Sequence, residues 1–263
     1  MRDEFEDFLK SGDAYLDAYD YVQAIVDFSR SIELRPRNPN AFLLRGFAHR
    51  MNGDAVLAIS DFTTSIKLLR RNPDAFFHRG CLHSAAGEYP AAIADIKHSI
   101  NLGTMAPDAY LQLGFACLQA KQYPAAIMNL NLSIKLNPGN LNAYLYLGYA
   151  YEETKNYQDA INSISIYFRN KRQAKSPPDP NAFLLLNRAY NCEIEKARSS
   201  IGVCHTIKAL DEAPSELMSS SSLSSSSPAE VLEGAHVTGV PAVAEPGFEA
   251  RVVEDNGTLS QGM

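Results

Sequence analysis

The sequence lacks several features that mark particular classes of protein. It has no tryptophan, and its four cysteines, Cys81, Cys117, Cys192 and Cys204, include no C-x-x-C pair. This spacing argues against a zinc ribbon or a redox motif and favours free thiols in a reducing compartment. No stretch approaches the roughly 20 apolar residues of a membrane helix, so we expect a cytoplasmic protein without a membrane partner.

An excess of basic charge is also lacking. Residues 1–213 carry 23 Lys and Arg and 23 Asp and Glu, whereas residues 214–263 carry one Arg and seven acidic residues. The net charge of -6 therefore belongs to the C-terminal segment. Because the rest of the chain is close to neutral and has no basic stripe, we expect no nucleic-acid partner.

What the sequence does have is a period of 34 residues. Five glycines follow it, and each is followed twelve residues later by an alanine. The glycines are Gly12, Gly46, Gly80, Gly114 and Gly148, and the alanines are Ala24, Ala58, Ala92, Ala126 and Ala160. An aromatic residue stands four before each glycine, and an isoleucine follows each alanine. Such self-similarity is typical of a repeat architecture.

Within one unit the apolar residues have helical spacing. Phe42, Gly46 and His49 stand at i, i+4 and i+7, and a second run of this kind begins at Ala58. A break at Asn52-Gly53-Asp54 separates the two runs. Each unit is therefore predicted to be two antiparallel helices, in which small residues let the two axes approach closely.

By these aromatic, glycine, alanine and turn-tyrosine positions the chain resembles the tetratricopeptide repeat family. The resemblance implies an all-α fold, a right-handed α-α superhelix, with five repeats over residues 1–170. Their approximate ranges are 5–38, 39–72, 73–106, 107–140 and 141–170.

Beyond the five repeats we expect three further segments. Residues 171–179 are predicted to be a basic and proline-containing insertion, and residues 180–213 a degenerate sixth repeat or capping helices. Residues 214–263, with eight serines among Ser219–Ser227, are predicted to be a disordered acidic tail. The basic run Arg169–Lys175 could support nuclear import, although such a run is more often a solvated loop.

The resemblance places a ligand on a concave surface formed by the first helix of each unit. At the positions that face it, aromatic and aliphatic residues outnumber charges, which favours an apolar groove for a peptide or helix. Some of these positions could equally be core between units. The candidate residues are Asn40, Leu43, Phe47, Arg50, Asp74, Phe77, Cys81, Asp108, Leu111, Phe115, Asn142, Leu145 and Tyr149.

Co-chaperones of the family bind an acidic C-terminal tail through a clamp of Lys, Arg and Asn side chains in three successive units. The matching positions here hold Leu43 and Phe47, then His78, then Asp108 and Gln112. These positions supply no cations, so we expect no chaperone-tail clamp.

No catalytic, metal or cofactor site is predicted. His49, His83 and Cys117 take equivalent places in adjacent units, but units about 10 Å apart cannot share one metal ion. The function predicted is therefore a non-enzymatic protein-interaction module, scaffold or adaptor for a protein or peptide partner of unknown identity. The alternative is a structural subunit of a larger complex with no peptide in the groove, and a carboxylate-clamp co-chaperone is the weakest candidate.

Overall fold

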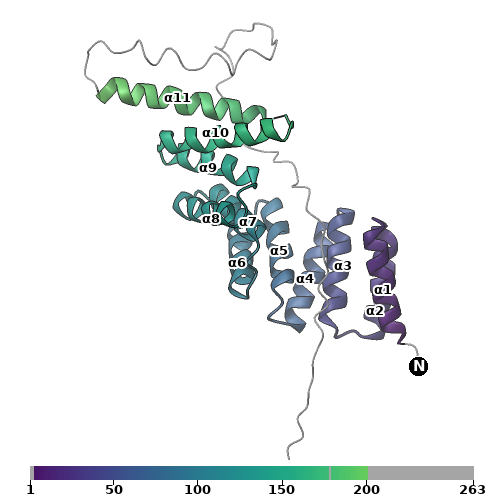
Figure 1. Cartoon of the computed structure of the whole chain (residues 1–263). Coiled ribbons are helices and arrows are strands. Elements are labelled where there is room, and N and C mark those ends of the chain that lie inside the picture. The colour runs from purple at the N-terminus through teal and green to yellow at the C-terminus, as the bar shows by residue number, and fades with distance from the viewer. Residues whose placement is uncertain (1–2, 178, 201–263) are drawn as a thin grey trace, which may run out of the picture. The chain divides into compact units, whose positions relative to one another are not determined.

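The computed structural model describes residues 3–177 and 179–200, and every element in this part of the chain is a helix. Figure 1 shows the helices following one another in chain order. Their bounds are α1 (Glu4–Asp17), α2 (Tyr21–Leu34), α3 (Pro39–Asn52), α4 (Ala55–Leu68), α5 (Pro73–Ala85), α6 (Tyr89–Asn101), α7 (Pro107–Gln119), α8 (Tyr123–Leu136), α9 (Leu141–Glu153), α10 (Tyr157–Gln173) and α11 (Pro180–Ser200). None of these helices is long and apolar enough to cross a membrane.

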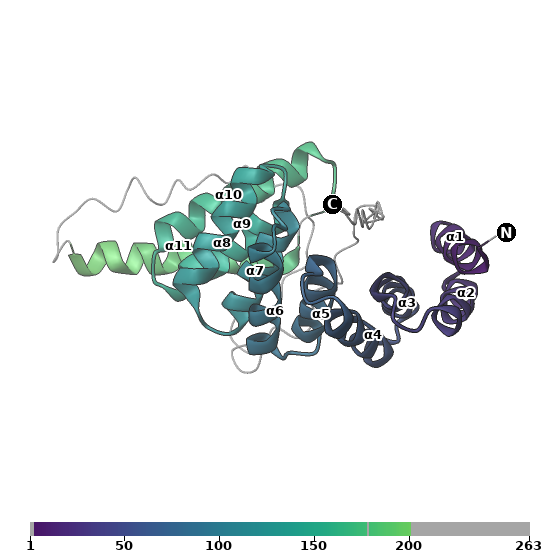
Figure 2. The ribbon, with the colours of Figure 1, turned by 90° about the horizontal axis from the view of Figure 1, so that it is seen from below.

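The helices pack as successive pairs. Each odd-numbered helix from α1 to α9, the first helix of its unit, contacts the second helix that follows it, and each second helix contacts the first helix of the next unit. Short turns make the two helices of a pair antiparallel (Figures 1 and 2). The predicted fold class, an all-α repeat of helix pairs, is confirmed.

Local sequence determines where the first helices begin. Pro39, Pro73 and Pro107 take the first helical position of α3, α5 and α7, where a missing N–H costs nothing because it would have no partner within the helix. The Asn38 side chain accepts hydrogen bonds from the backbone N–H groups at the start of α3, and Asn72 does the same for α5. These three prolines therefore mark the starts of first helices.

The repeated glycines allow the two helices of each unit to approach closely. A Cβ atom on Gly80 would lie 2.7 Å from Cγ1 of Ile96, which is too close unless the Ile96 side chain or one of the two helices shifts. In every unit the nearest side chain is the one 16 residues later in the chain, namely Phe28, Phe62, Ile96, Leu130 or Ile164. All five of these side chains are fully buried, so the steric reason predicted for the glycines is confirmed.

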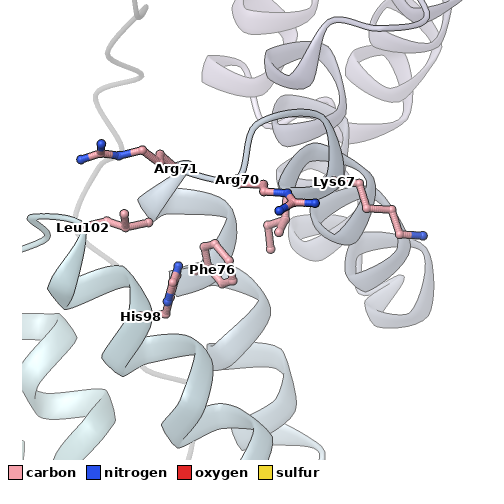
Figure 3. A pocket seen from close by; sticks show the side chains of 7 residues that line it. Lys67, Arg70, Arg71, Phe76, His98 and Leu102 are labelled. Carbon is pink, nitrogen blue, oxygen red and sulfur yellow. The ribbon is translucent and has the colours of Figure 1, made fainter.

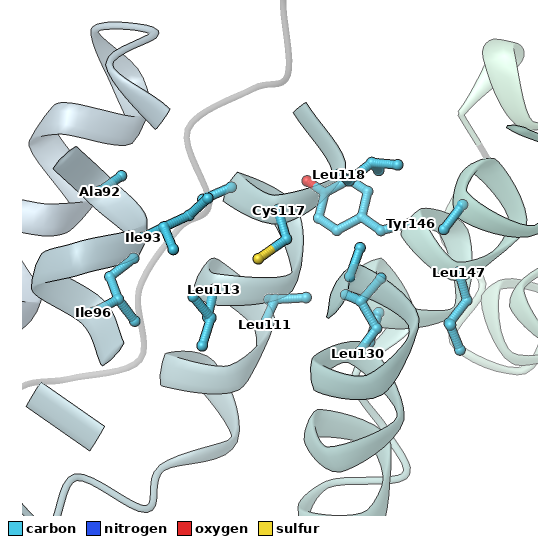
Figure 4. Close-up of a cluster of buried hydrophobic side chains, with 14 residues drawn as sticks. Ala92, Ile93, Ile96, Leu111, Leu113, Cys117, Leu118, Leu130, Tyr146 and Leu147 are labelled. Atoms are coloured by element: carbon cyan, nitrogen blue, oxygen red, sulfur yellow. The ribbon is translucent and has the colours of Figure 1, made fainter. Parts of the chain in front are cut away.

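The apolar core continues from unit to unit. Its largest described cluster draws residues from α6, α7, α8 and α9, and Figure 4 shows Leu113 and Cys117 of α7 between Ile96 of α6 and Leu130 of α8. Each unit buries its apolar faces against its neighbours as well as within itself, which is how repeat proteins are stabilised.

Two partly buried ion pairs repeat in the N-terminal half. Arg45 makes two hydrogen bonds to Asp61, at 2.9 and 2.8 Å, and Arg79 makes two to Asp95, both at 2.8 Å. Each arginine also bonds to a hydroxyl of the preceding unit, Ser29 or Thr63. These arginines therefore link three helices each. The equivalent residues of the next two units are Leu113 and Leu147, which are buried.

The structure corrects one expectation near residue 170. The basic run from Arg169 was expected to be a loop, but its first five residues belong to α10, which ends at Gln173. No glycine or proline interrupts the chain before Pro177, and Lys171 and Arg172 lie in the last turn, where cations interact favourably with the helix dipole. The sixth unit is described only as α11, so residues 201–213 and the predicted disordered tail, 214–263, lie outside the described residues.

Candidate partner-binding strip

The candidate residues lie on four consecutive first helices, α3, α5, α7 and α9. These helices also contact one another directly, α3 with α5, α5 with α7, and α7 with α9. Side chains from four different units are therefore neighbours along one row of helices.

Three of the candidates belong to the core. Leu43, Leu111 and Leu145 are only 8%, 2% and 6% exposed, and each is a member of a buried hydrophobic cluster. For these residues the structure favours the core alternative that the sequence left open, because a buried side chain cannot be offered to a ligand without repacking. These three leucines are part of the core on which the more exposed candidates pack.

Four aromatic candidates are half-buried, and we call them the aromatic strip: Phe47, Phe77, Phe115 and Tyr149. Three of them rest on another ring, and in two cases that ring belongs to the next unit. The Phe47 ring lies 5.5 Å from His78, and the Phe115 ring lies 5.0 Å from Tyr146. Within α5, Phe77 lies 5.3 Å from His78. The aromatic strip is thus held in place by the fold and is still partly open to solvent.

His78 and Tyr146, which support the strip, occupy the same repeat position and were not among the candidates. Sequence spacing could have shown that they share a helix with the strip, but not that their rings contact strip residues of the preceding unit. Both are buried, at 5% and 7% exposure. The supporting layer of the strip is therefore aromatic as well.

A hydrogen bond fixes the tautomer of His78. Arg50 Nη1 donates to Nδ1 of His78 at 2.7 Å, and because a guanidinium can only donate, Nδ1 carries no proton. Burial, and secondarily the positive charge of Arg50, lower the pKa of His78 to about 3. His78 is therefore neutral at physiological pH.

The tyrosines at the α9 end of the strip also stay neutral. Burial, followed by the negative charge of Asp179, raises the pKa of both Tyr146 and Tyr149 to about 12. Their hydroxyl groups are therefore protonated at physiological pH and can donate hydrogen bonds. The strip ends in a group that is apolar along its ring and polar at its tip.

The comparisons with known proteins agree with the helical-repeat fold. A family model described as tetratricopeptide repeat matches residues 142–167, which span most of α9 and α10. A crystal structure of MamA is 24% identical with a TM-score of 0.58, and it covers 62% of this chain and 96% of that chain. The structure of MamA from residue 41 to the end, from Desulfovibrio magneticus RS-1, is 18% identical with a TM-score of 0.63, covering 67% and 99%.

A third solved structure adds a description of its own. It is that of YrrB, described as a TPR protein with an unusual peptide-binding site, which is 15% identical with a TM-score of 0.60 and covers 69% of this chain and 90% of that chain. The fold is that of a tetratricopeptide repeat protein. The structural likenesses, all below 25% identity, show the fold alone, and a search of curated proteins gave no match.

The polar candidates flank the aromatic strip along the same four helices. Asn40, Arg50, Cys81, Asp108 and Asn142 are half-buried. The sixth polar candidate, the carboxylate at position 74, is exposed. The strip is thus an apolar band with polar groups beside it, the usual composition of a binding site for an apolar side chain on a polar backbone.

The residues that might have formed a metal site have separate environments. His83 Nδ1 lies 2.5 Å from Glu88, His49 Nδ1 lies 3.6 Å from Asp54, and Cys117 is fully buried in the core. Within residues 3–177 and 179–200, no three His, Cys, Asp or Glu side chains come together as metal ligands. Packing and local ion pairs account for these three residues.

Proposed function

We propose that this protein is a non-enzymatic interaction module that binds a peptide or helix of a protein partner on the aromatic strip. The observation that carries the proposal is the strip itself, since four partly open aromatic rings follow one another on α3, α5, α7 and α9. Aromatic residues are enriched among the residues that contribute most to binding energy at interfaces.

The packing of the rings favours binding because little freedom remains to be lost. Immobilising a side chain on binding costs about 0.5–1.5 kcal/mol. Phe47 and Phe115 already pack against His78 and Tyr146 in the folded protein, so much of their side-chain freedom is lost before a partner binds. The uncovered part of each ring is then available to bury apolar side chains of a partner.

Polar groups beside the rings can bind the partner's backbone. The amides of Asn40 and Asn142 can donate and accept hydrogen bonds, and the guanidinium of Arg50 is oriented by His78. A peptide whose apolar side chains lie on the rings could form hydrogen bonds from its backbone carbonyl and amide groups to these residues. The strip would then select for apolar side chains at a spacing set by the repeats.

The alternative is a structural subunit whose strip is never filled. The exposed residues of the second helices, such as Val56 and Met128 at 81% and 59% exposure, would then carry the interface. The four cysteines lie far apart in the sequence with no C-x-x-C pair, which favours a reducing compartment, and we place the protein in the cytoplasm on this ground.

The test compares a charge placed inside and outside the strip. A partner captured with the full chain is purified, and its affinity is measured by calorimetry against wild type, Phe115→Lys and the control Met128→Lys on α8. Because a charge would replace an apolar anchor, we expect Phe115→Lys to weaken binding by about 2 kcal/mol, or about thirtyfold, and Met128→Lys to have little effect. Thermal melting of Phe115→Lys and of the milder Phe115→Ala separates lost binding from lost folding.

Salt and a second ligand sharpen this test. Because apolar burial does not depend on ion pairs, the affinity should change little between low and high salt. A peptide with an acidic chaperone-type tail should bind no better than a scrambled peptide. A partner that tolerates Phe115→Lys but is lost in high salt would contradict the proposal.

A further inference from the structure

A pocket lies away from the strip, at the junction between the second and third units. It has a volume of about 550 Å³. Among the residues that line it are Lys67, Arg70, Arg71, Phe76, His98 and Leu102, from the end of α4, the following loop, α5 and the end of α6. Volumes of this size accommodate small molecules and single peptide side chains.

Positive charge dominates the rim of the pocket. Lys67, Arg70 and Arg71 are exposed, and none of them forms an ion pair within the described part of the chain. The segment from Phe62 to Pro73 has no acidic residue at all. By contrast, Arg79, in the second turn of α5, is paired with Asp95 and also bonds to the Thr63 hydroxyl.

The floor of the pocket is apolar and aromatic. The rings of Phe76 and His98 lie 4.3 Å apart, and Leu102 completes the same side of the pocket. Figure 3 shows Phe76 and His98 next to each other, with Lys67 and Arg71 on opposite sides of them. An anionic group at the rim could therefore bind together with an apolar group on the floor.

The fold does not require cations at this junction. In three other units the residues equivalent to Lys67, Arg70 and Arg71 include at most one cation each. They are Glu33, Pro36 and Arg37 one unit earlier, Asn101, Thr104 and Met105 one unit later, and Lys135, Pro138 and Gly139 two units later. The helices form in all four units, so the fold does not depend on these cations. Among the four units compared, only this one carries all three.

We propose that this pocket is a second binding site, for an acidic peptide segment that carries an apolar side chain next to its carboxylates. The carboxylates would pair with Lys67, Arg70 and Arg71, and the apolar side chain would lie against Phe76 and Leu102. A peptide fits better than a nucleic acid, because three cations around one pocket do not form the extended basic stripe that a phosphate backbone requires.

The probe is a fluorescent peptide in which one phenylalanine is flanked by glutamates on both sides. Its binding to the full chain is followed by fluorescence anisotropy at low and high salt. We expect Arg70→Glu/Arg71→Glu to lower the affinity about tenfold, since two rim charges are reversed. Arg37→Glu changes the same charge at the position equivalent to Arg71 and should leave the affinity unchanged.

Two further comparisons identify the site and the ligand class. Peptides with glutamine for glutamate, or with glycine for phenylalanine, should both bind more weakly than the probe. Phe115→Lys should leave the affinity for the probe unchanged. The proposal for this pocket and the proposal for the aromatic strip can therefore be contradicted independently. The milder Arg70→Gln/Arg71→Gln should reduce affinity as well, and thermal melting of both double variants, unchanged from wild type, excludes misfolding as the cause of the loss.

Several results would overturn the proposal. They are absence of probe binding, equal loss of affinity with Arg37→Glu, equal binding of the glutamine peptide, and displacement of the probe by an RNA oligonucleotide that binds more tightly. Each of these would show that the three cations form an ordinary solvated surface or serve another ligand.

Discussion

Replacing Gly80 by leucine should separate the two helices of the third unit. In the structure a Cβ atom at this position meets Ile96 Cγ1 at 2.7 Å, Asp95 Cβ at 3.2 Å and the backbone oxygen of Ala92 at 3.3 Å. Ile96 is fully buried and β-branched, so its side chain has no other rotamer to adopt at low cost. The backbone of α6 blocks a second direction.

The magnitude follows from two opposing effects. Exchanging glycine for leucine within a helix gains up to about 0.8 kcal/mol of intrinsic helix stability. Overpacking a filled core costs about 1–3 kcal/mol for a few added methylenes, and leucine adds its remaining carbons where even the first one does not fit. We expect the free energy of unfolding to fall by about 3 kcal/mol, which lowers the Tm by about 6–12 °C in a chain of this size.

The matched control is Ser84→Ala, one turn further along α5. Ser84 is buried, and its hydroxyl has no hydrogen-bond partner within the described residues. Removing this hydroxyl therefore removes the desolvation penalty of an unsatisfied polar group. The free energy of unfolding of this variant should lie within about 0.5 kcal/mol of wild type. Urea unfolding followed by circular dichroism measures both variants, and similar midpoints for the two would refute the packing role of Gly80.

Two more variants test the polar interior. The pKa of His78 in the folded protein, about 3, lies below its unfolded value of about 6.5, so on acidification the unfolded chain binds the proton first. Between pH 7 and pH 5 the free energy of unfolding of wild type should therefore fall by about 2 kcal/mol through this group. The His78→Leu variant should not show this part of the loss. Parallel urea titrations at the two pH values measure this, and an identical loss in both proteins would show that His78 is not the cause. Asp95→Asn should cost about 2 kcal/mol because the partly buried Arg79 exchanges a charged hydrogen-bond partner for a neutral one. Arg79→Leu/Asp95→Asn, the pair present as Leu113 and Asn129 in the next unit, should recover most of that loss, and a double variant as unstable as the single one would contradict this.

The helix pairs could be predicted from sequence because their cause is local and repeated. A glycine such as Gly114 can be recognised from its spacing, and the residue that fills the space above it, Leu130, follows at a constant distance in the chain. Proline and asparagine before Ala41 and Ala75 likewise mark helix starts through contacts within a few residues. Period and turn chemistry therefore predict this part of the fold well.

The candidate site was less predictable because it depends on contacts between units. Leu43 and Phe47 lie one turn apart on the same helix, yet Leu43 is buried and Phe47 is half-open. The difference arises from the facing helix of the next unit, where His78 contacts Phe47. The basic pocket shows the same limitation, since His98 lies more than 20 residues from Phe76 in the chain and reaches it only after α5 and α6 pair.

The most direct test of partner binding by the aromatic strip is site-specific photo-crosslinking in the presence of the purified partner. A photoreactive phenylalanine analogue is placed at position 115 on α7 or, for comparison, at position 128 on α8, where the native methionine is more exposed than Phe115. If the strip is the binding surface, the partner is captured from position 115 and not from position 128. Capture from position 128 alone would show that the second helices carry the interface and that the aromatic strip does not.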